Sequence, residues 1–370
     1  MTLTAPDCMQ PSSPPDISPR NDLPSADMPA LDPPPVATDL FLGIDVGGTN
    51  VKVGLVDGSG VLHAKASTAT PPLKTPDRVF RYAIDFAIRT MRHWDRPIDD
   101  LMAVGLAVPG VLDTREFQLR EVVNLPGWLG QPLRDILVDT CQRPAMVVND
   151  ANAAAYAEHS LRKLGDQSLA LVTLGTGIGA GVVTAGRPHG GDHGCAGEVG
   201  HIAIEFGDMA LPCTCGSRGH LESYAGAAGV IARLRASMPE DYQTNSDQID
   251  RDQISRDLYA GQPWTPRSIA MAAADGDALC LQIIDQTGDY VGRAIGMLGQ
   301  TLDPAVVLLG GAMTFGGDQT STGRGFLERI RRSVTDTTLV QVGGNIQVEF
   351  ASLGNDAGTL GAAMVAKNLT

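Results

Sequence analysis

Two glycine-rich turns, each between two apolar segments, constrain the fold of this chain more than any other feature. They lie in residues 42–57, LGIDVGGTNVKVGLVD, and residues 169–185, LALVTLGTGIGAGVVTA. Alternating apolar residues on both sides of a glycine turn predict a β-hairpin. One such turn alone is weak evidence for a function. Two of them, a little over a hundred residues apart, predict a duplicated phosphate-binding turn with one copy in each of two lobes.

The turn of the first hairpin also contains candidate metal-binding and phosphate-binding residues. Asp45 lies inside an apolar strand, where burying a carboxylate is unfavourable unless a cation or a hydrogen-bond donor meets it. Gly47 and Gly48 lack the side chains that would keep backbone N–H groups away from an anion. The pattern indicates a carboxylate that holds a metal ion beside amides that hold phosphate. An ordinary tight hairpin with a surface aspartate is the alternative.

Length and charge narrow the classes of protein that remain. A chain of 370 residues favours two lobes over one core. The net charge of −14 disfavours a nucleic-acid partner, because phosphate contacts need clustered Lys and Arg. No apolar segment approaches the roughly 20 residues that cross a bilayer. The six scattered cysteines and the absence of a signal-peptide pattern lead us to expect a cytoplasmic protein.

Two polar segments are expected to lie outside the core. Residues 1–38 carry ten of the 24 prolines and predict a disordered leader. Proline at this density also cannot form a helix-turn-helix. Residues 239–266 predict a loop excursion to which we assign no chemistry.

Polar side chains follow the ends of several predicted strands. Asn149 and Asp150 end a short buried strand and begin an Ala-rich helix at 151–164, the position where open α/β sheets bind ligands. A helix N-cap would explain one of the two side chains and leave the other free. Asn124 suits a sugar hydroxyl, with a turn-capping role as the alternative. A third buried strand runs into Gly310-Gly311, where backbone can approach a flat or anionic ligand.

Candidate metal ligands and carboxylates are concentrated in two segments, GEVGH at residues 197–201 and CTCGSRGHLE at residues 213–222. Two histidines and two cysteines give four soft or borderline ligands that suit tetrahedral Zn²⁺. They are His201, Cys213, Cys215 and His220. A closed four-ligand site would be structural and would hold Glu198 and Glu222 toward one pocket. Surface histidines beside a reduced cysteine pair are the alternative.

Six motifs, in this order and spacing, resemble the ROK family of sugar kinases and repressors within the actin-like ATPase superfamily. They are DVGGTN, VNDAN, LGTGIGAG, GEVGH, CTCGSRGHLE and LLGGAM, and the likeness covers about residues 40–368. Asn124 within NLPGW further resembles glucokinase members. The resemblance implies a two-lobed α/β actin-like (ribonuclease H-like) fold with an interlobe active-site cleft. We expect an N-terminal lobe at 39–150 with the C-terminal helix 357–370, and a C-terminal lobe at 151–356 with a zinc loop at 195–222.

The family likeness also implies roles for matching residues. Asp150 would be the catalytic base. The sugar would be bound by Asn124, Asn149, Asp150, Glu198, His201 and Glu222. The nucleotide-binding turns would be Gly47, Gly48, Thr49, Thr176, Gly177, Gly310 and Gly311, with Asp45 near Mg²⁺. His201, Cys213 and Cys215 match zinc ligands, whereas His220 stands where family members commonly have a third cysteine.

The implied activity is transfer of the γ-phosphoryl group of ATP to the 6-hydroxyl of glucose, in a protein expected to be a homodimer. Positioning and charge neutralisation would supply most of the catalysis. We expect Asp150 to be ionised at neutral pH, because the helix dipole favours the anion. The alternatives are an N-acetylhexosamine or fructose kinase, a sugar-sensing repressor and a non-catalytic zinc-stabilised sugar-binding protein. Polyphosphate is the less favoured donor, because it would need a basic groove.

Overall fold

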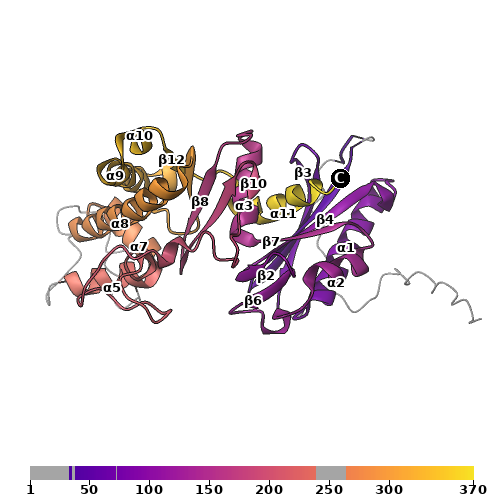
Figure 1. The fold of residues 1–370 in the computed structure, drawn as a ribbon, viewed down its shortest axis with the longest axis horizontal. Coiled ribbons are helices and arrows are strands. Elements are labelled where there is room, and N and C mark those ends of the chain that lie inside the picture. Colours follow the sequence, from indigo (N-terminus) through magenta and orange to yellow (C-terminus); the bar gives the residue numbers. More distant parts are fainter. Residues whose placement is uncertain (1–32, 36–37, 72, 239–263) are drawn as a thin grey trace, which may run out of the picture.

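The computed structural model describes residues 33–35, 38–71, 73–238 and 264–370, which form two lobes side by side (Figure 1). The predicted leader, residues 1–38, and the predicted excursion, residues 239–266, lie almost wholly outside the described residues. Within the described residues, no helix has both the length and the apolar character needed to cross a membrane.

The first lobe is built on a five-stranded sheet in the order β3-β2-β1-β4-β7. Its strands are β1 (Leu40–Val46), β2 (Asn50–Asp57), β3 (Leu62–Ala69), β4 (Leu101–Val108) and β7 (Ala145–Asn149). β1 and β2 form the first predicted hairpin, and β4 and β7 continue the sheet in parallel with β1. Parallel strands need covered faces, and their near-continuous apolar sequences match that need.

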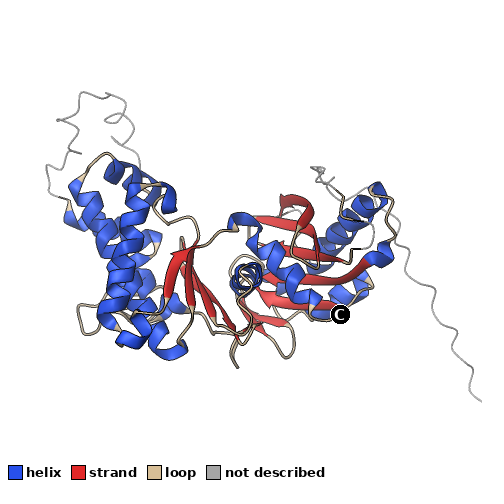
Figure 2. Ribbon diagram, turned by 90° about the horizontal axis from the view of Figure 1, so that it is seen from above, coloured by secondary structure: helices blue, strands red, loops and turns tan. Residues whose placement is uncertain are grey.

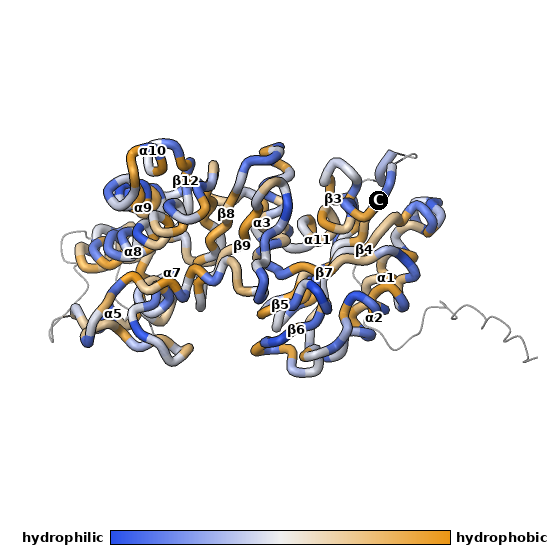
Figure 3. The backbone as a smooth tube through the Cα atoms, viewed as in Figure 1, coloured by the Kyte–Doolittle hydropathy of each residue, from blue (hydrophilic) through white to orange (hydrophobic). Residues whose placement is uncertain are grey.

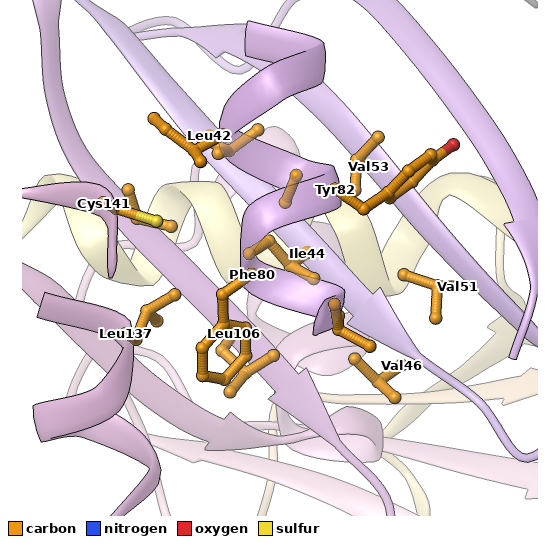
Figure 4. Packing of buried hydrophobic residues seen from close by; sticks show 14 of the residues in the cluster. Leu42, Ile44, Val46, Val51, Val53, Phe80, Tyr82, Leu106, Leu137 and Cys141 are labelled. Carbon is orange, nitrogen blue, oxygen red and sulfur yellow. The ribbon is translucent and has the colours of Figure 1, made fainter. Parts of the chain in front are cut away.

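Helices cover both faces of this sheet. On one face lie α1 (Pro76–His93), which contacts β1 and β2, and α2 (Leu133–Cys141), which contacts α1 and β7. Figure 4 shows Phe80 of α1 and Leu137 of α2 in one hydrophobic cluster with Ile44 of β1. On the other face lies α11 (Ala357–Lys367). Gly43 and Gly105 allow its close approach, because a Cβ atom at either position would lie 2.0 Å or less from a carbonyl oxygen of α11.

The second lobe repeats this plan, with the sheet order β10-β9-β8-β11-β12. Its strands are β8 (Leu169–Leu174), β9 (Ile178–Thr184), β10 (Arg187–Pro188), β11 (Val306–Gly310) and β12 (Gln347–Phe350). Its helices gather on the side away from the first lobe (Figure 2), and they are α4 (Leu221–Ala225), α5 (Ala227–Ser237), α7 (Pro266–Ala274), α8 (Ala278–Leu302), α9 (Ser321–Thr337) and α10 (Val340–Gly343). The second predicted hairpin, β8 with β9, is confirmed.

Two segments connect the lobes, and each contains a helix. α3 (Asp150–Leu161) follows β7 and packs on β8 and β9, and α11 follows β12 and packs on α3. The buried carboxylate of Glu158 accepts hydrogen bonds from the backbone N–H groups of Ser352 and Leu353 and pairs with Arg162. These bonds fix the segment that leaves β12 to the helix that leaves β7.

The sequence patterns missed some elements. α2 and the small hairpin of β5 (Val111–Asp113) and β6 (Gln118–Glu121) were not predicted, and α3 ends three residues before the predicted end at residue 164. Hydrophobic residues concentrate in the strands and at the inner sides of the helices (Figure 3). Short elements with few apolar positions give little periodicity to read.

Candidate active site

A cavity of about 450 Å³, here called the front cavity, lies between the lobes. Strand ends of both sheets and the first turns of α3 and α11 line it. Four of the predicted site residues are among its lining residues, namely Asp45, Asn149, Asp150 and Glu198. The tertiary structure therefore brings together groups that are more than 150 residues apart in sequence.

Asp150 is the first residue of α3, and its Oδ1 accepts a hydrogen bond of 2.8 Å from the N–H of Ala151. Burial raises the pKa of this carboxyl to about 6. The hydrogen bond from Ala151 lowers the pKa, whereas repulsion by the carboxylates of Asp45 and Glu198 raises it further. Burial therefore outweighs the helix N-terminus, which by itself would favour the anion. At pH 7 the carboxyl is still mainly ionised, and a pKa near the working pH suits a group that accepts a proton.

Because burial disfavours the charged carboxylate, Asp150→Asn is expected to stabilise the protein at alkaline pH. The pKa of Asp150 is about 6 in the folded chain, against an ordinary value of 3.8. Ionisation of this carboxyl therefore destabilises the folded state increasingly as the pH rises from 3.8 to 6, and by its full amount above pH 6. Such a difference corresponds to roughly 3 kcal/mol. We expect urea unfolding to show a gain of about 1–3 kcal/mol at pH 8 that disappears near pH 4. A variant less stable than the native protein at pH 8 would contradict this expectation.

Asn149 takes the capping role that the sequence left open between two residues. Its Oδ1 accepts a hydrogen bond from the N–H of Asn152 at 3.1 Å, and its Nδ2 donates to the carbonyl of Gly110 at 3.1 Å. This N-cap satisfies one of the free N–H groups at the start of α3. The cap leaves the Asp150 carboxylate beside the cavity, available to a ligand.

Asp45 and Lys52 face each other across the first hairpin. They are direct cross-strand partners, and Lys52 Nζ lies 3.3 Å from Asp45 Oδ2 and 3.0 Å from the carbonyl of Asn355. Burial raises the pKa of Asp45, whereas Lys52 lowers it. α11 begins beside the carboxylate, and a Cβ atom at Gly358 would lie 2.8 Å from Asp45 Cγ. Lys52 was not predicted, although the register of the hairpin pairs it with Asp45.

The described lining of the front cavity contains three carboxylates, on Asp45, Asp150 and Glu198, against one cationic side chain, on Lys52. An excess of oxygen ligands with unbalanced negative charge is the donor set that Mg²⁺ prefers. The residues present therefore fit a magnesium ion held near Asp45.

Three other predicted sugar-binding residues do not line the described cavity. Glu222 Oε2 accepts a hydrogen bond of 2.9 Å from the N–H of Ile178, so its carboxylate braces the β8–β9 turn instead of lying free beside Glu198. Asn124 lies against Gly48, at the turn between β1 and β2. His201 belongs to the cysteine and histidine cluster described below.

The predicted nucleotide-binding residues form two groups. Gly47, Gly48 and Thr49 make the β1–β2 turn of the first lobe. Thr176 and Gly177 make the β8–β9 turn of the second lobe, and the segment after β11 lies against it, because Met313 donates its N–H to the carbonyl of Leu174. Gly310 and Gly311 therefore lie next to the second turn, and Gly311 has a φ of +89°.

A smaller cavity of about 290 Å³ opens beside these glycines, between α7 and the segment 312–322. Met271 and Phe315 are among its lining residues. No sequence pattern predicts this cavity, because its walls come from segments 266–274 and 312–322, which are more than thirty residues apart in the chain.

The four predicted zinc ligands converge, and their donor atoms all lie within 4.8 Å of one another. The two Nδ1 atoms of His201 and His220 are 3.3 Å apart, and Cys215 Sγ lies 3.3 Å from His220 Nδ1. Bond lengths of about 2.0–2.3 Å at a tetrahedral zinc separate the ligand atoms by roughly these distances. The geometry fits a Cys₂His₂ zinc site that includes His220.

The two similar lobes with a carboxylate-lined cavity between them have the two-lobed actin-like ATPase fold. The ROK family model matches residues 41–369, and the chain belongs to the ROK family.

Its similar proteins include kinases whose structures are solved. The glucokinase of Halalkalibacterium halodurans is 30% identical over 329 residues, which cover 88% of this chain and 94% of that protein. The ROK hexokinase from Thermus thermophilus is 30% identical, with a TM-score of 0.70, and the match covers 89% of this chain and 98% of that one. A ROK family glucokinase from Streptomyces griseus, in complex with glucose and AMPPNP, is 26% identical, with a TM-score of 0.64 over 89% and 99% of the two chains. N-acetylmannosamine kinases and xylose repressors are also similar, at 27% and 26% identity.

Proposed function

We propose that this protein is an ATP-dependent sugar kinase that converts glucose to glucose 6-phosphate. The observation that carries the proposal is the Asp150 carboxylate, which begins α3 beside the front cavity while Asn149 provides the helix cap. Similar proteins named glucokinase, and a similar glucokinase bound to glucose and AMPPNP, support glucose and ATP as substrates. We also propose that it is a cytoplasmic homodimer with the two lobes assigned above.

In the proposed reaction, Asp150 orients the 6-hydroxyl of the sugar toward the γ-phosphorus and accepts its proton late. The transition state of phosphoryl transfer is loose, so orientation and charge neutralisation contribute more than base strength. We assign Glu198, Asn124, Asn149, His201 and Glu222 to the sugar. Since Glu222 is bound to the β8–β9 turn in this structure, its proposed contact with sugar requires that hydrogen bond to rearrange or to be shared.

The two groups of glycines are proposed to hold ATP from opposite lobes. The cavity of about 290 Å³ beside Gly311 is apolar enough at Met271 and Phe315 for a purine base. The phosphates would then extend toward the β1–β2 turn, with Mg²⁺ near Asp45. A magnesium ion supplies charge neutralisation between the phosphate oxygens.

Zinc is proposed as a structural ion held by His201, Cys213, Cys215 and His220. Four protein ligands leave no open position for substrate, so the ion would stabilise the loop rather than take part in chemistry. The loop then holds His201 and, three residues before it, Glu198.

Steady-state kinetics with ATP against glucose, mannose, fructose, N-acetylglucosamine and N-acetylmannosamine test the proposal. Glucose should give the highest kcat/KM, and ATP should be a better donor than polyphosphate. A higher value for either N-acetylhexosamine would favour the alternative represented by the similar N-acetylmannosamine kinases. No turnover with any sugar would reject the kinase proposal and leave a binding or regulatory role.

The rate is expected to depend on the ionisation of Asp150. Its pKa of about 6 lies above the ordinary value, and only the carboxylate can accept a proton. We therefore expect kcat/KM for glucose to be level above pH 7 and to fall about tenfold per pH unit below 6. A pH series with saturating Mg²⁺ and ATP measures this limb. A level profile down to pH 5 would remove Asp150 from the role of base.

Lys52 is expected to contribute to turnover with MgATP, because it is the single cationic side chain in the described lining of the front cavity. Lys52→Met should lower kcat/KM for MgATP by about tenfold or more, since it leaves three carboxylates facing the phosphates. Lys65→Met is the matched control, because Lys65 is exposed and pairs with Asp356 in the same loop that Lys52 contacts. Equal losses in both variants would show that Lys52 only tethers this loop.

A further inference from the structure

A second cavity, here called the rear cavity, lies between the lobes and measures about 690 Å³. Asn149 and Gly194 line both this cavity and the front cavity, so the two are neighbours that share a wall. The lining of the rear cavity comes from β7 and the β5–β6 hairpin of the first lobe, from β10 of the second lobe and from the end of α11. The volume is in the range of pockets that bind small organic molecules.

Asn152 offers a hydrogen-bond donor to the rear cavity. Asn152 is 4% exposed, and its Oδ1 accepts a hydrogen bond of 2.8 Å from the N–H of Val182. Its Nδ2 donates to no group among the described residues, although Asn152 lines the cavity. This nitrogen is not among the fully buried polar atoms that lack a partner, so it is accessible and can donate to water or to a ligand in the cavity.

The charge of the rear cavity is opposite to that of the front cavity. Arg187 lines it, and its exposed side chain makes no ion pair or hydrogen bond with the described residues. No carboxylate side chain is present in the described lining, although the whole chain has a net charge of −14. Arginine binds carboxylate and phosphate oxygens through two parallel hydrogen bonds. The polar groups of this cavity thus offer donors to an anion.

The remaining wall is mainly apolar. Leu112, Met146 and Val365 lie on different elements and line the same space. A free sugar would leave its hydroxyls facing this apolar wall without partners, whereas an aromatic or aliphatic body would bury apolar surface there.

We propose that the rear cavity binds a small organic anion with an apolar body, either a carboxylate or a phosphate monoester. The anionic group binds Arg187 and the Nδ2 of Asn152, and the body packs against the apolar wall. Because Asn149 caps the helix that begins with Asp150 and also lines the rear cavity, occupancy alters turnover at the front cavity. This coupling, unlike the binding itself, rests on the proposed kinase function.

Calorimetric titration with 1-naphthoate, 1-naphthyl phosphate and the neutral 1-naphthamide tests binding without any use of activity. We expect at least one anion to bind with a Kd below about 1 mM and the amide to bind about tenfold more weakly. The stronger of the two anions identifies carboxylate or phosphate as the preferred group. Failure of both anions to bind at millimolar concentration would overturn the proposal.

Variants of the two cavities distinguish their roles. Arg187→Gln should weaken anion binding about tenfold or more. Asn152→Asp keeps an acceptor for the N–H of Val182 but replaces the free donor with a negative charge, and should also abolish binding. Lys52→Met removes the cation of the front cavity and should leave binding unchanged. Loss of binding in Lys52→Met, or unchanged binding in Arg187→Gln, would place the anion elsewhere and overturn the proposal.

The coupling is measured separately, as glucose phosphorylation with and without the bound anion. If the bound anion changes kcat severalfold in the native protein and has no effect on kcat in Arg187→Gln, the coupling is supported. Anion binding with unchanged kcat retains the site and overturns the coupling.

Discussion

Asp150→Asn is expected to lower kcat for glucose phosphorylation by about two to four orders of magnitude, the usual contribution of a positioned general base. Glucose binding should change only severalfold, because asparagine keeps the size of the side chain and can still accept the hydrogen bond from Ala151. Single-turnover kinetics and calorimetric glucose titration separate the two effects. Together with the stability gain expected at alkaline pH, this would make Asp150 a residue that opposes folding and promotes catalysis.

Asp277→Asn is the matched control for this variant. Asp277 caps α8 through a hydrogen bond from Cys280, and it is not among the described lining residues of the front cavity. Since asparagine caps helices as well as aspartate does, we expect turnover close to that of the native protein. Near-native turnover in Asp150→Asn would reject the proposed role of Asp150. A large loss in Asp277→Asn would instead indicate a general effect of such replacements.

Loss of zinc is expected to have the largest effect on stability. Structural zinc contributes on the order of 10 kcal/mol in small domains, and removing one ligand forfeits much of that energy. Elemental analysis should find about one zinc per chain in the native protein. Cys213→Ser should lose the metal and unfold at a temperature about 10 °C lower, as a loss of 3–5 kcal/mol in a lobe of this size implies. Activity should fall with it, because His201 and Glu198 lie on the same segment.

Cys195→Ser provides the control for the zinc prediction. Cys195 lies in the predicted zinc loop and is exposed, and its Sγ makes a hydrogen bond to the carbonyl of His193. It should keep both zinc and melting temperature. His220→Cys should also keep zinc, because thiolate and imidazole both bind zinc in tetrahedral sites. A native protein without zinc, or equal melting temperatures in Cys213→Ser and Cys195→Ser, would contradict the structural role.

Much of the fold could be predicted from the sequence because the signals are local. Alternation around the two glycine turns predicted both hairpins, and the Ala-rich segment after Asp150 predicted α3. The expected zinc ligands converge because three of them lie within eight residues, so the chain itself keeps them close. The sequence also predicts Asp45, Asn149, Asp150 and Glu198 as site residues, and all four line one cavity in the structure.

Other properties depended on how distant segments pack. The pKa of Asp150 is raised by burial and by Asp45 and Glu198, none of which the local helix dipole predicts. Contacts between elements also place Glu222 at the N–H of Ile178 and pair Asp45 with Lys52. The rear cavity likewise forms only where segments of both lobes meet. The sequence by itself determined the strands, the turns and the kinds of ligand atoms, because periodicity and spacing act over a few residues. Only the tertiary structure decided which charges face each other, because solvation and Coulomb interaction depend on distances that the order of residues does not specify.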